Sequence, residues 1–127
     1  MANDYAGTVP ANSIVEITDY TAGTGVWTVD RPARENSDLT MVTDDNAIPN
    51  GGTGKATFYG PAKVTVDDDG VGELWLGDYV GAQTDDFVPL MGNVGWQMVG
   101  IIDDGPSVFS AMVMRKSIFA TWLDEGE

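Results

Sequence analysis

Eight short runs of β-branched and aromatic residues recur along the chain, and clusters of Gly, Pro, Asn and Asp separate them. Runs of this kind favour strands, and the clusters favour tight turns. The runs are SIVEIT (13–18), GVWTV (25–29), DLTMVT (38–43), KATFY (55–59), AKVTV (62–66), GELWL (72–76), WQMVGIID (96–103) and SVFSAMVMR (107–115). The spacing predicts an all-β chain that folds as a single compact β-barrel or β-sandwich.

The chain of 127 residues is long enough for one domain, which we place at residues 13–115. Residues 1–12 offer few side chains to bury, so we expect a flexible N-terminal arm there. Residues 116–127 are expected to form a C-terminal arm or a short helix, in which Ile118, Phe119 and Trp122 would share one apolar stripe. This segment would either close the core or dock on a partner.

Apolar patterning distinguishes the last two runs from the others. The run at 62–66 alternates apolar and polar residues, which predicts a strand at the surface with one solvated face. The runs at 96–103 and 107–115 have apolar residues on both faces, which predicts central strands or strands with one face on a partner subunit. A hairpin turn is expected between them, and Gly100 indicates a bulge. The candidate interface residues are Met98, Ile102, Val108, Met112, Met114, Ile118, Phe119 and Trp122.

The charge of the chain limits its partners. There are 20 acidic and 6 basic residues, which give a formal net charge of -14. Such a field repels nucleic acid and anionic lipid, and no apolar run approaches the ~20 residues that span a bilayer. The chain has no cysteine and no histidine, which removes the commonest zinc ligands and the commonest general base. We therefore expect a protein that is not an enzyme and binds neither nucleic acid nor membrane.

Two glycine-containing stretches invite comparison with ligand-binding loops. PNGGTGKAT (49–57) resembles a phosphate-binding loop, but Pro49 stands at the first required glycine and Ala56 at the magnesium-binding hydroxyl. A β-rich segment follows it where the phosphate loop needs a helix. VDDDGVGE (66–73) resembles part of a calcium-binding loop, with Asp67, Asp69 and Gly70 at matching positions. The first ligand position of such a loop falls on Thr65, so an acidic turn is the better interpretation. No cofactor and no metal are predicted.

Aromatic residues suggest one alternative function, because tryptophan and tyrosine rings can stack on sugars in carbohydrate-binding modules. In a small β protein the same residues also serve as core or interface anchors. The residues in question are Trp27, Trp75, Trp96 and Trp122, with Tyr59 and Tyr79.

Three phrases carry a resemblance to a known group of proteins. NAIPNGGTGKAT (46–57), VGELWLG (71–77) and GWQMVGIID (95–103), followed by a final β-hairpin, resemble a pattern of small proteins encoded among the structural genes of tailed bacteriophages. The likeness runs from Asn46 to Arg115. It departs from the group's GExWG phrase by the insertion of Leu76.

The resemblance implies a component of the virion without catalytic residues. The expected role is a head decoration, or cement, protein on the capsid surface, made in the host cytoplasm. Its partners would be the major capsid protein and further copies of itself in a homo-oligomer, with a trimer as one option. A tail or head-fibre accessory protein is the alternative within the same class.

Overall fold

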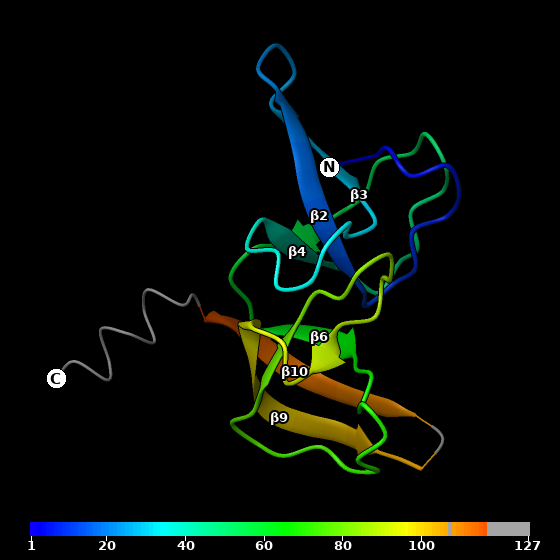
Figure 1. Ribbon diagram of the computed structural model, residues 1–127. Helices are drawn as coiled ribbons and strands as arrows, with labels where there is room; N and C mark the ends of the chain where they lie inside the picture. Colours follow the sequence, from blue (N-terminus) through cyan, green and yellow to red (C-terminus); the bar gives the residue numbers. More distant parts are fainter. Residues whose placement is uncertain (107, 117–127) are drawn as a thin grey trace, which may run out of the picture.

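The computed structural model describes residues 1–106 and 108–116, which form ten strands and no helix (Figure 1). The strands make two five-stranded sheets, which confirms the all-β class. The first sheet has the order β1-β3-β2-β4-β5, with β1 (Ala2–Asn3), β2 (Ile14–Thr21), β3 (Val26–Asp30), β4 (Thr40–Thr43) and β5 (Ala56–Thr57). The second has the order β6-β10-β9-β7-β8, with β6 (Ala62–Thr65), β7 (Tyr79–Gly81), β8 (Leu90–Met91), β9 (Gly95–Asp104) and β10 (Phe109–Lys116).

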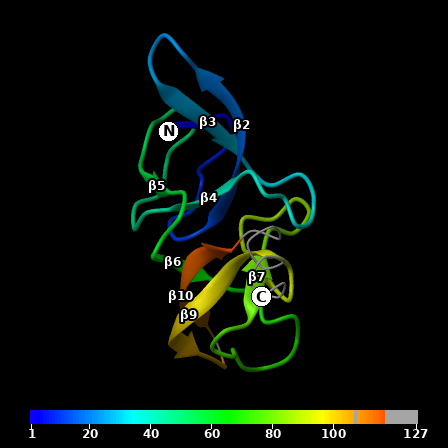
Figure 2. The same ribbon diagram turned by 90° about the vertical axis from the view of Figure 1, so that its left-hand side faces the viewer.

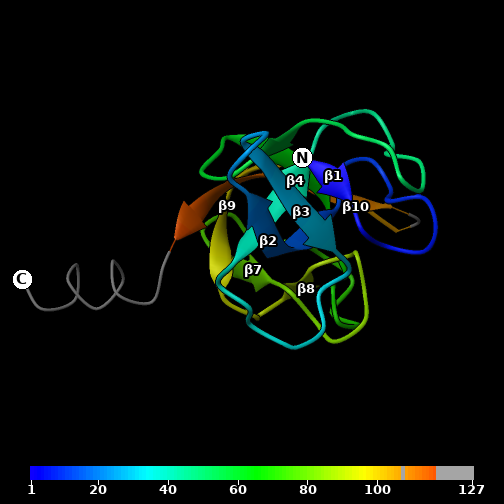
Figure 3. The same cartoon turned by 90° about the horizontal axis from the view of Figure 1, so that it is seen from above.

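The first sheet is built around the long β2–β3 hairpin, whose turn projects at the top of Figure 1. Alternation along β2 divides its side chains between two cores. Ile14 belongs to the cluster shared with the second sheet, and its neighbour Val15 belongs to a cluster on the outer face of the first sheet. Toward the turn, Tyr20 pairs with Trp27 across the hairpin. Seen from above, the strands of the first sheet lie over those of the second (Figure 3).

The second sheet has β9 and β10 at its centre, as their two apolar faces predict. Their register shifts at Val99 and at Ile102, so bulges occur on both sides of Gly100, whereas Gly100 itself pairs with Met112 and is not the bulged residue. The strand β6 lies at one edge, with Ala62 and Val64 buried and the alternate side chains exposed. The run at 62–66 is therefore the surface strand that its alternation predicts.

Residues 1–12 do not form the expected arm. Val9 is buried and pairs with Ile48, and β1 adds to the edge of the first sheet in parallel with β3. The side-chain amide of Asn3 donates hydrogen bonds to the carbonyls of Gly7, Ile48 and Pro49. The segment packs because its few apolar groups meet others from residues 46–54. Of the expected C-terminal arm, Lys116 ends β10 and residues 117–127 lie outside the described residues.

The glycine-rich stretch 49–57 is the partner of this N-terminal segment. Gly54 N–H donates to the Met1 carbonyl and Asn3 N–H donates to the Gly52 carbonyl, each at 3.0 Å. Gly51 has a φ of 74°, and a Cβ at Gly54 would lie 2.6 Å from Ile48 Cγ1. The glycines thus serve the backbone, as the sequence indicates, by allowing a left-handed turn and a close approach.

Two hydrogen-bonding side chains hold the sheets together. Trp96 of β9 is buried, and its indole Nε1–H donates to Thr40 Oγ1 of β4 at 3.0 Å. The guanidinium of Arg115, at the end of β10, donates to the carbonyls of Phe58, Asp38 and Thr40. It also stacks 4.1 Å from the Phe58 ring centroid and 4.8 Å from that of Trp96. Burial lowers the pKa of Arg115, against the opposing effect of the Asp38 carboxylate.

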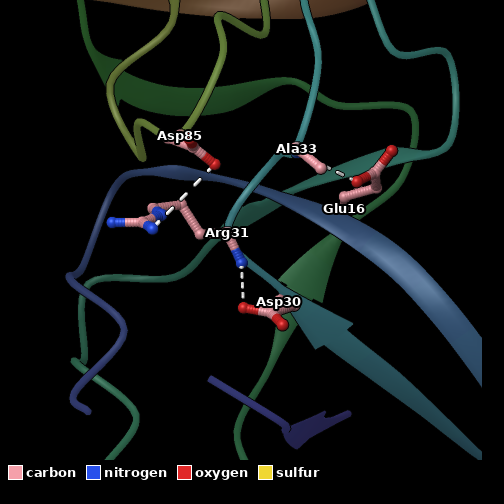
Figure 4. A network of polar contacts seen from close by, with 5 residues as sticks. All are labelled: Glu16, Asp30, Arg31, Ala33 and Asp85. Carbon is pink, nitrogen blue, oxygen red and sulfur yellow. Dashed lines mark hydrogen bonds and ion pairs between the residues drawn. The ribbon is translucent and has the colours of Figure 1, made fainter. Parts of the chain in front are cut away.

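The loop after β3 fastens the first sheet to the loop before β8 (Figure 4). Arg31 and Asp85 form an ion pair at 3.9 Å, while Glu16 accepts hydrogen bonds from Ala33 N–H and Ser37 Oγ–H. Farther along the same loop, Asn36 N–H donates to the Ala82 carbonyl of the second sheet. Together with the shared core, these contacts join the sheets into one unit, which Figure 2 shows with β2 and β3 above β9 and β10.

Candidate functional site

The outer half of β9 carries apolar side chains that the fold leaves in solvent. From Val99 to the end of the strand no residue is buried, although Ala111 of β10, the partner of Ile101, lies in the core between the sheets. Val99, Ile101 and Ile102 are between 38 and 48% exposed. Hydrocarbon at this density normally lies in a core, so its exposure makes this part of β9 a candidate contact surface.

A turn from the preceding loop extends this surface. Leu74 N–H donates to Asp104 Oδ1, and Gly77 N–H donates to the Met98 carbonyl at 2.9 Å. These two anchors hold residues 74–77 alongside β9, while Trp75 and Leu76 between them are 56 and 66% exposed. We call the combined region the β9 surface. It consists of Trp75, Leu76, Val99, Ile101 and Ile102, all exposed.

The run GELWL was predicted as a strand, and that prediction is wrong. Gly72 and Gly77 flank the apolar residues with φ values of 88° and 91°, which a strand does not contain. Only Leu74 enters the core. Residues 74–76, between Gly72 and Gly77, therefore form an anchored turn in which the side chains of Trp75 and Leu76 point outward.

The charge around the β9 surface is of one sign. No lysine or arginine occurs between Lys63 and Arg115, and this interval contains all the acidic residues of the second sheet and its loops. Several of those carboxylates also shape turns. Asp68 Oδ2 accepts from Gly72 N–H at 2.7 Å, and Asp67 Oδ1 accepts from Asp69 N–H at 3.0 Å. The acidic turn expected at 66–73 is thus present.

The predicted interface residues on β9 and β10 differ in how exposed they are. Met98 is fully buried in the core between the sheets, so it is not free to contact a partner and its assignment is corrected. It points inward together with Trp96, because no register shift interrupts the alternation between these two residues of β9. Ile102, Val108 and Met114 are exposed, and Met112 is half-buried. Ile118, Phe119 and Trp122 lie outside the described residues.

Sequence reasoning missed part of the β9 surface. The run at 72–76 places Trp75 and Leu76 in a predicted strand, and the candidate interface residues include neither Val99 nor Ile101. The one available signal was the pair of glycines around the apolar run at 73–76, which indicates a turn.

The three tryptophans in the part of the chain that the structure describes do not assemble a common platform. Trp96 is buried between the sheets, whereas Trp27 lies in β3 of the first sheet and Trp75 in the loop before β7 of the second. Trp122 lies outside the described residues. Stacking of a sugar chain across several tryptophans has no support in this arrangement.

A second apolar feature lies in the first sheet. Ile17 of β2, Trp27 of β3, Met41 of β4 and Phe58 after β5 line a hollow of about 280 Å³. We call it the first-sheet groove. The Tyr20 ring packs against Trp27 at its rim, with a centroid separation of 4.5 Å.

Other kinds of site were sought in residues 1–106 and 108–116. In this part of the chain, no three acidic, histidine or cysteine side chains are grouped so that they could hold a metal ion. The same residues contain no helix with the length and apolar character needed to cross a membrane. No family model, curated protein or solved structure matches the chain.

Proposed function

We propose that this chain is a non-enzymatic structural protein of a bacteriophage virion, of the head decoration class, which binds and stabilises the capsid shell. The observation that carries the proposal is the β9 surface, where Trp75 and Leu76 are held outward by backbone anchors on β9. A backbone that is already anchored loses little conformational freedom on binding, which favours a protein contact.

The charge distribution supports a protein partner with basic groups. Because residues 64–114 contain no lysine or arginine, this part of the second sheet and its loops repels phosphate and attracts cationic side chains, and the basic residues of the sheet lie in β6 (Lys63) and at the end of β10 (Arg115 and Lys116). A decoration protein has to attach to a shell filled with DNA without binding the DNA itself. A predominantly acidic surface with an apolar centre fits that requirement, and complementary charge on the shell would speed the encounter.

In this proposal the carboxylates near the β9 surface shape the backbone and do not take part in catalysis. Those of Asp67 and Asp68 accept backbone hydrogen bonds within their own turn, and that of Asp104 anchors Leu74. An enzyme with neither histidine nor cysteine would depend on such carboxylates or on its few lysines and tyrosines. Assigning them to the shape of the β9 surface accounts for their positions.

The test is binding to empty capsid shells of tailed phages, measured by co-sedimentation together with the native mass of the free protein. We expect Leu76→Ser to weaken shell binding at least tenfold and to leave the fold unchanged. Leu39→Ser is the matched control, since Leu39 is 56% exposed and lies outside the β9 surface. Equal binding by the two variants would exclude the β9 surface as the contact.

A protein that is monomeric and binds no shell would overturn the proposed function. The rival within the virion class is a tail or head-fibre component. Labelling the protein in intact particles and locating the label by electron microscopy separates the two, because a decoration protein covers the head whereas a fibre component does not.

A further inference from the structure

The first-sheet groove is the part of the outer face of its sheet that the N-terminal segment leaves open. Val9, Val15, Val29 and Ile48 form the buried cluster on this face. Ile17 and Met41 pack at the margin of that cluster and also line the groove, next to Trp27 and Phe58. The groove therefore continues a hydrophobic core beyond the point where the described chain covers it.

The strand β10 ends beside this groove. Arg115 of β10 stacks on the Phe58 ring at 4.1 Å, and its guanidinium donates to the carbonyl of Thr40, the residue before Met41. Two of the four groove residues are thus adjacent to the end of β10. Residues 117–127, which lie outside the described residues, have the sequence SIFATWLDEGE.

We propose that the first-sheet groove binds the apolar side chains of residues 118–122 of the same chain. Phe119 and Trp122 are the anchors, because a hollow of about 280 Å³ suits one or two large side chains. An extended chain advances roughly 3.3 Å per residue, so Ile118 lies within about 10 Å of Arg115 and Trp122 within about 25 Å. The segment can reach the groove without any change in the described fold.

The same chain is favoured over a second copy for two reasons. The segment is tethered next to the groove, so its effective concentration far exceeds that of a free copy. The net charge of -14 also opposes the approach of another molecule. The groove belongs to the first sheet and the β9 surface to the second, so occupancy of the groove and binding to a shell can succeed or fail separately.

The test uses the full chain with a nitroxide attached at Ala120→Cys, which is the only thiol because the protein has no cysteine. Paramagnetic broadening is then measured on the methionine methyl groups by NMR. We expect strong broadening of the Met41 methyl in the groove. The Met91 methyl, in β8 of the second sheet, should stay sharp and shows that the fold is intact.

A matched variant carries the same label together with Phe119→Ser and Trp122→Ser. This variant should lose most of the Met41 broadening, since the two anchor side chains are gone while the chain that connects the label to β10 is unchanged. If Met41 is not broadened, or if Met41 and Met91 are broadened equally, the proposal is wrong. A mixture of labelled chain with unlabelled, isotope-enriched chain tests the second copy, and broadening of Met41 in that mixture would overturn binding within one chain.

Discussion

Replacement of Arg115 by methionine should destabilise the protein by about 3 kcal/mol, a large share of the roughly 5–15 kcal/mol of a typical domain. The guanidinium donates to three carbonyls, of which those of Phe58 and Thr40 are partly buried and that of Asp38 is exposed. Water can replace Arg115 at Asp38, but the other two carbonyls lose a charged donor at about 1.5 kcal/mol each. Loss of the stacking on Phe58 destabilises the variant by about 1 kcal/mol. Removal of a partly buried charge stabilises it by about 1 kcal/mol, so these two contributions roughly cancel.

Urea unfolding followed by far-UV circular dichroism measures this loss. Arg115→Lys keeps the charge but cannot supply the planar fork of donors, so it should lose about half as much. Lys63→Met removes an exposed cation of β6 and should change the free energy of unfolding by less than about 0.5 kcal/mol. A loss below about 1 kcal/mol for Arg115→Met, or wild-type stability for Arg115→Lys, would refute the role of Arg115 as the link between the sheets.

Two further substitutions test the packing. Trp96→Phe removes the indole donor and leaves the Thr40 hydroxyl buried without it, so about 2 kcal/mol should be lost in the same urea assay; an unchanged midpoint would contradict this hydrogen bond. Gly81→Ala should cost more than about 2 kcal/mol, because the new Cβ would overlap the backbone carbonyl of Val94, which cannot move cheaply. Gly23→Ala is its control, since nothing lies within 4 Å of a Cβ there, and equal losses for the two glycines would show that the overlap is relieved.

Much of the fold can be predicted from local patterns in the sequence, because the strands and turns concerned depend mainly on neighbouring residues. The alternation at 62–66 predicts the edge strand β6, and the apolar faces of 96–103 and 107–115 predict the central hairpin. The pairing of Val9 with Ile48 could not be predicted, since it joins segments about forty residues apart and no local pattern in either segment indicates the other. An apparent N-terminal arm is therefore part of the core.

The candidate site was partly predictable for the same reason. Exposed Ile102, Val108 and Met114 follow from strands that are apolar on both faces, since one face has to remain outside the core. The exposed positions of Trp75 and Leu76 could not be predicted. The hydrogen bond from Leu74 N–H to Asp104 Oδ1, which anchors the turn that contains them, joins residues thirty positions apart. The first-sheet groove takes its lining from four separate segments, and no local pattern unites them.

Exposed hydrocarbon and net charge have opposite effects on how copies of this chain associate. The β9 surface favours association by burying apolar area, whereas bringing two such surfaces together also brings together acidic residues with no lysine or arginine between positions 64 and 114. The repulsion is long-range at low ionic strength and is screened by salt. A basic shell would remove it, since each bound copy would place its carboxylates against cationic groups. The proposed homo-oligomer is therefore expected to form more readily on the shell than in free solution.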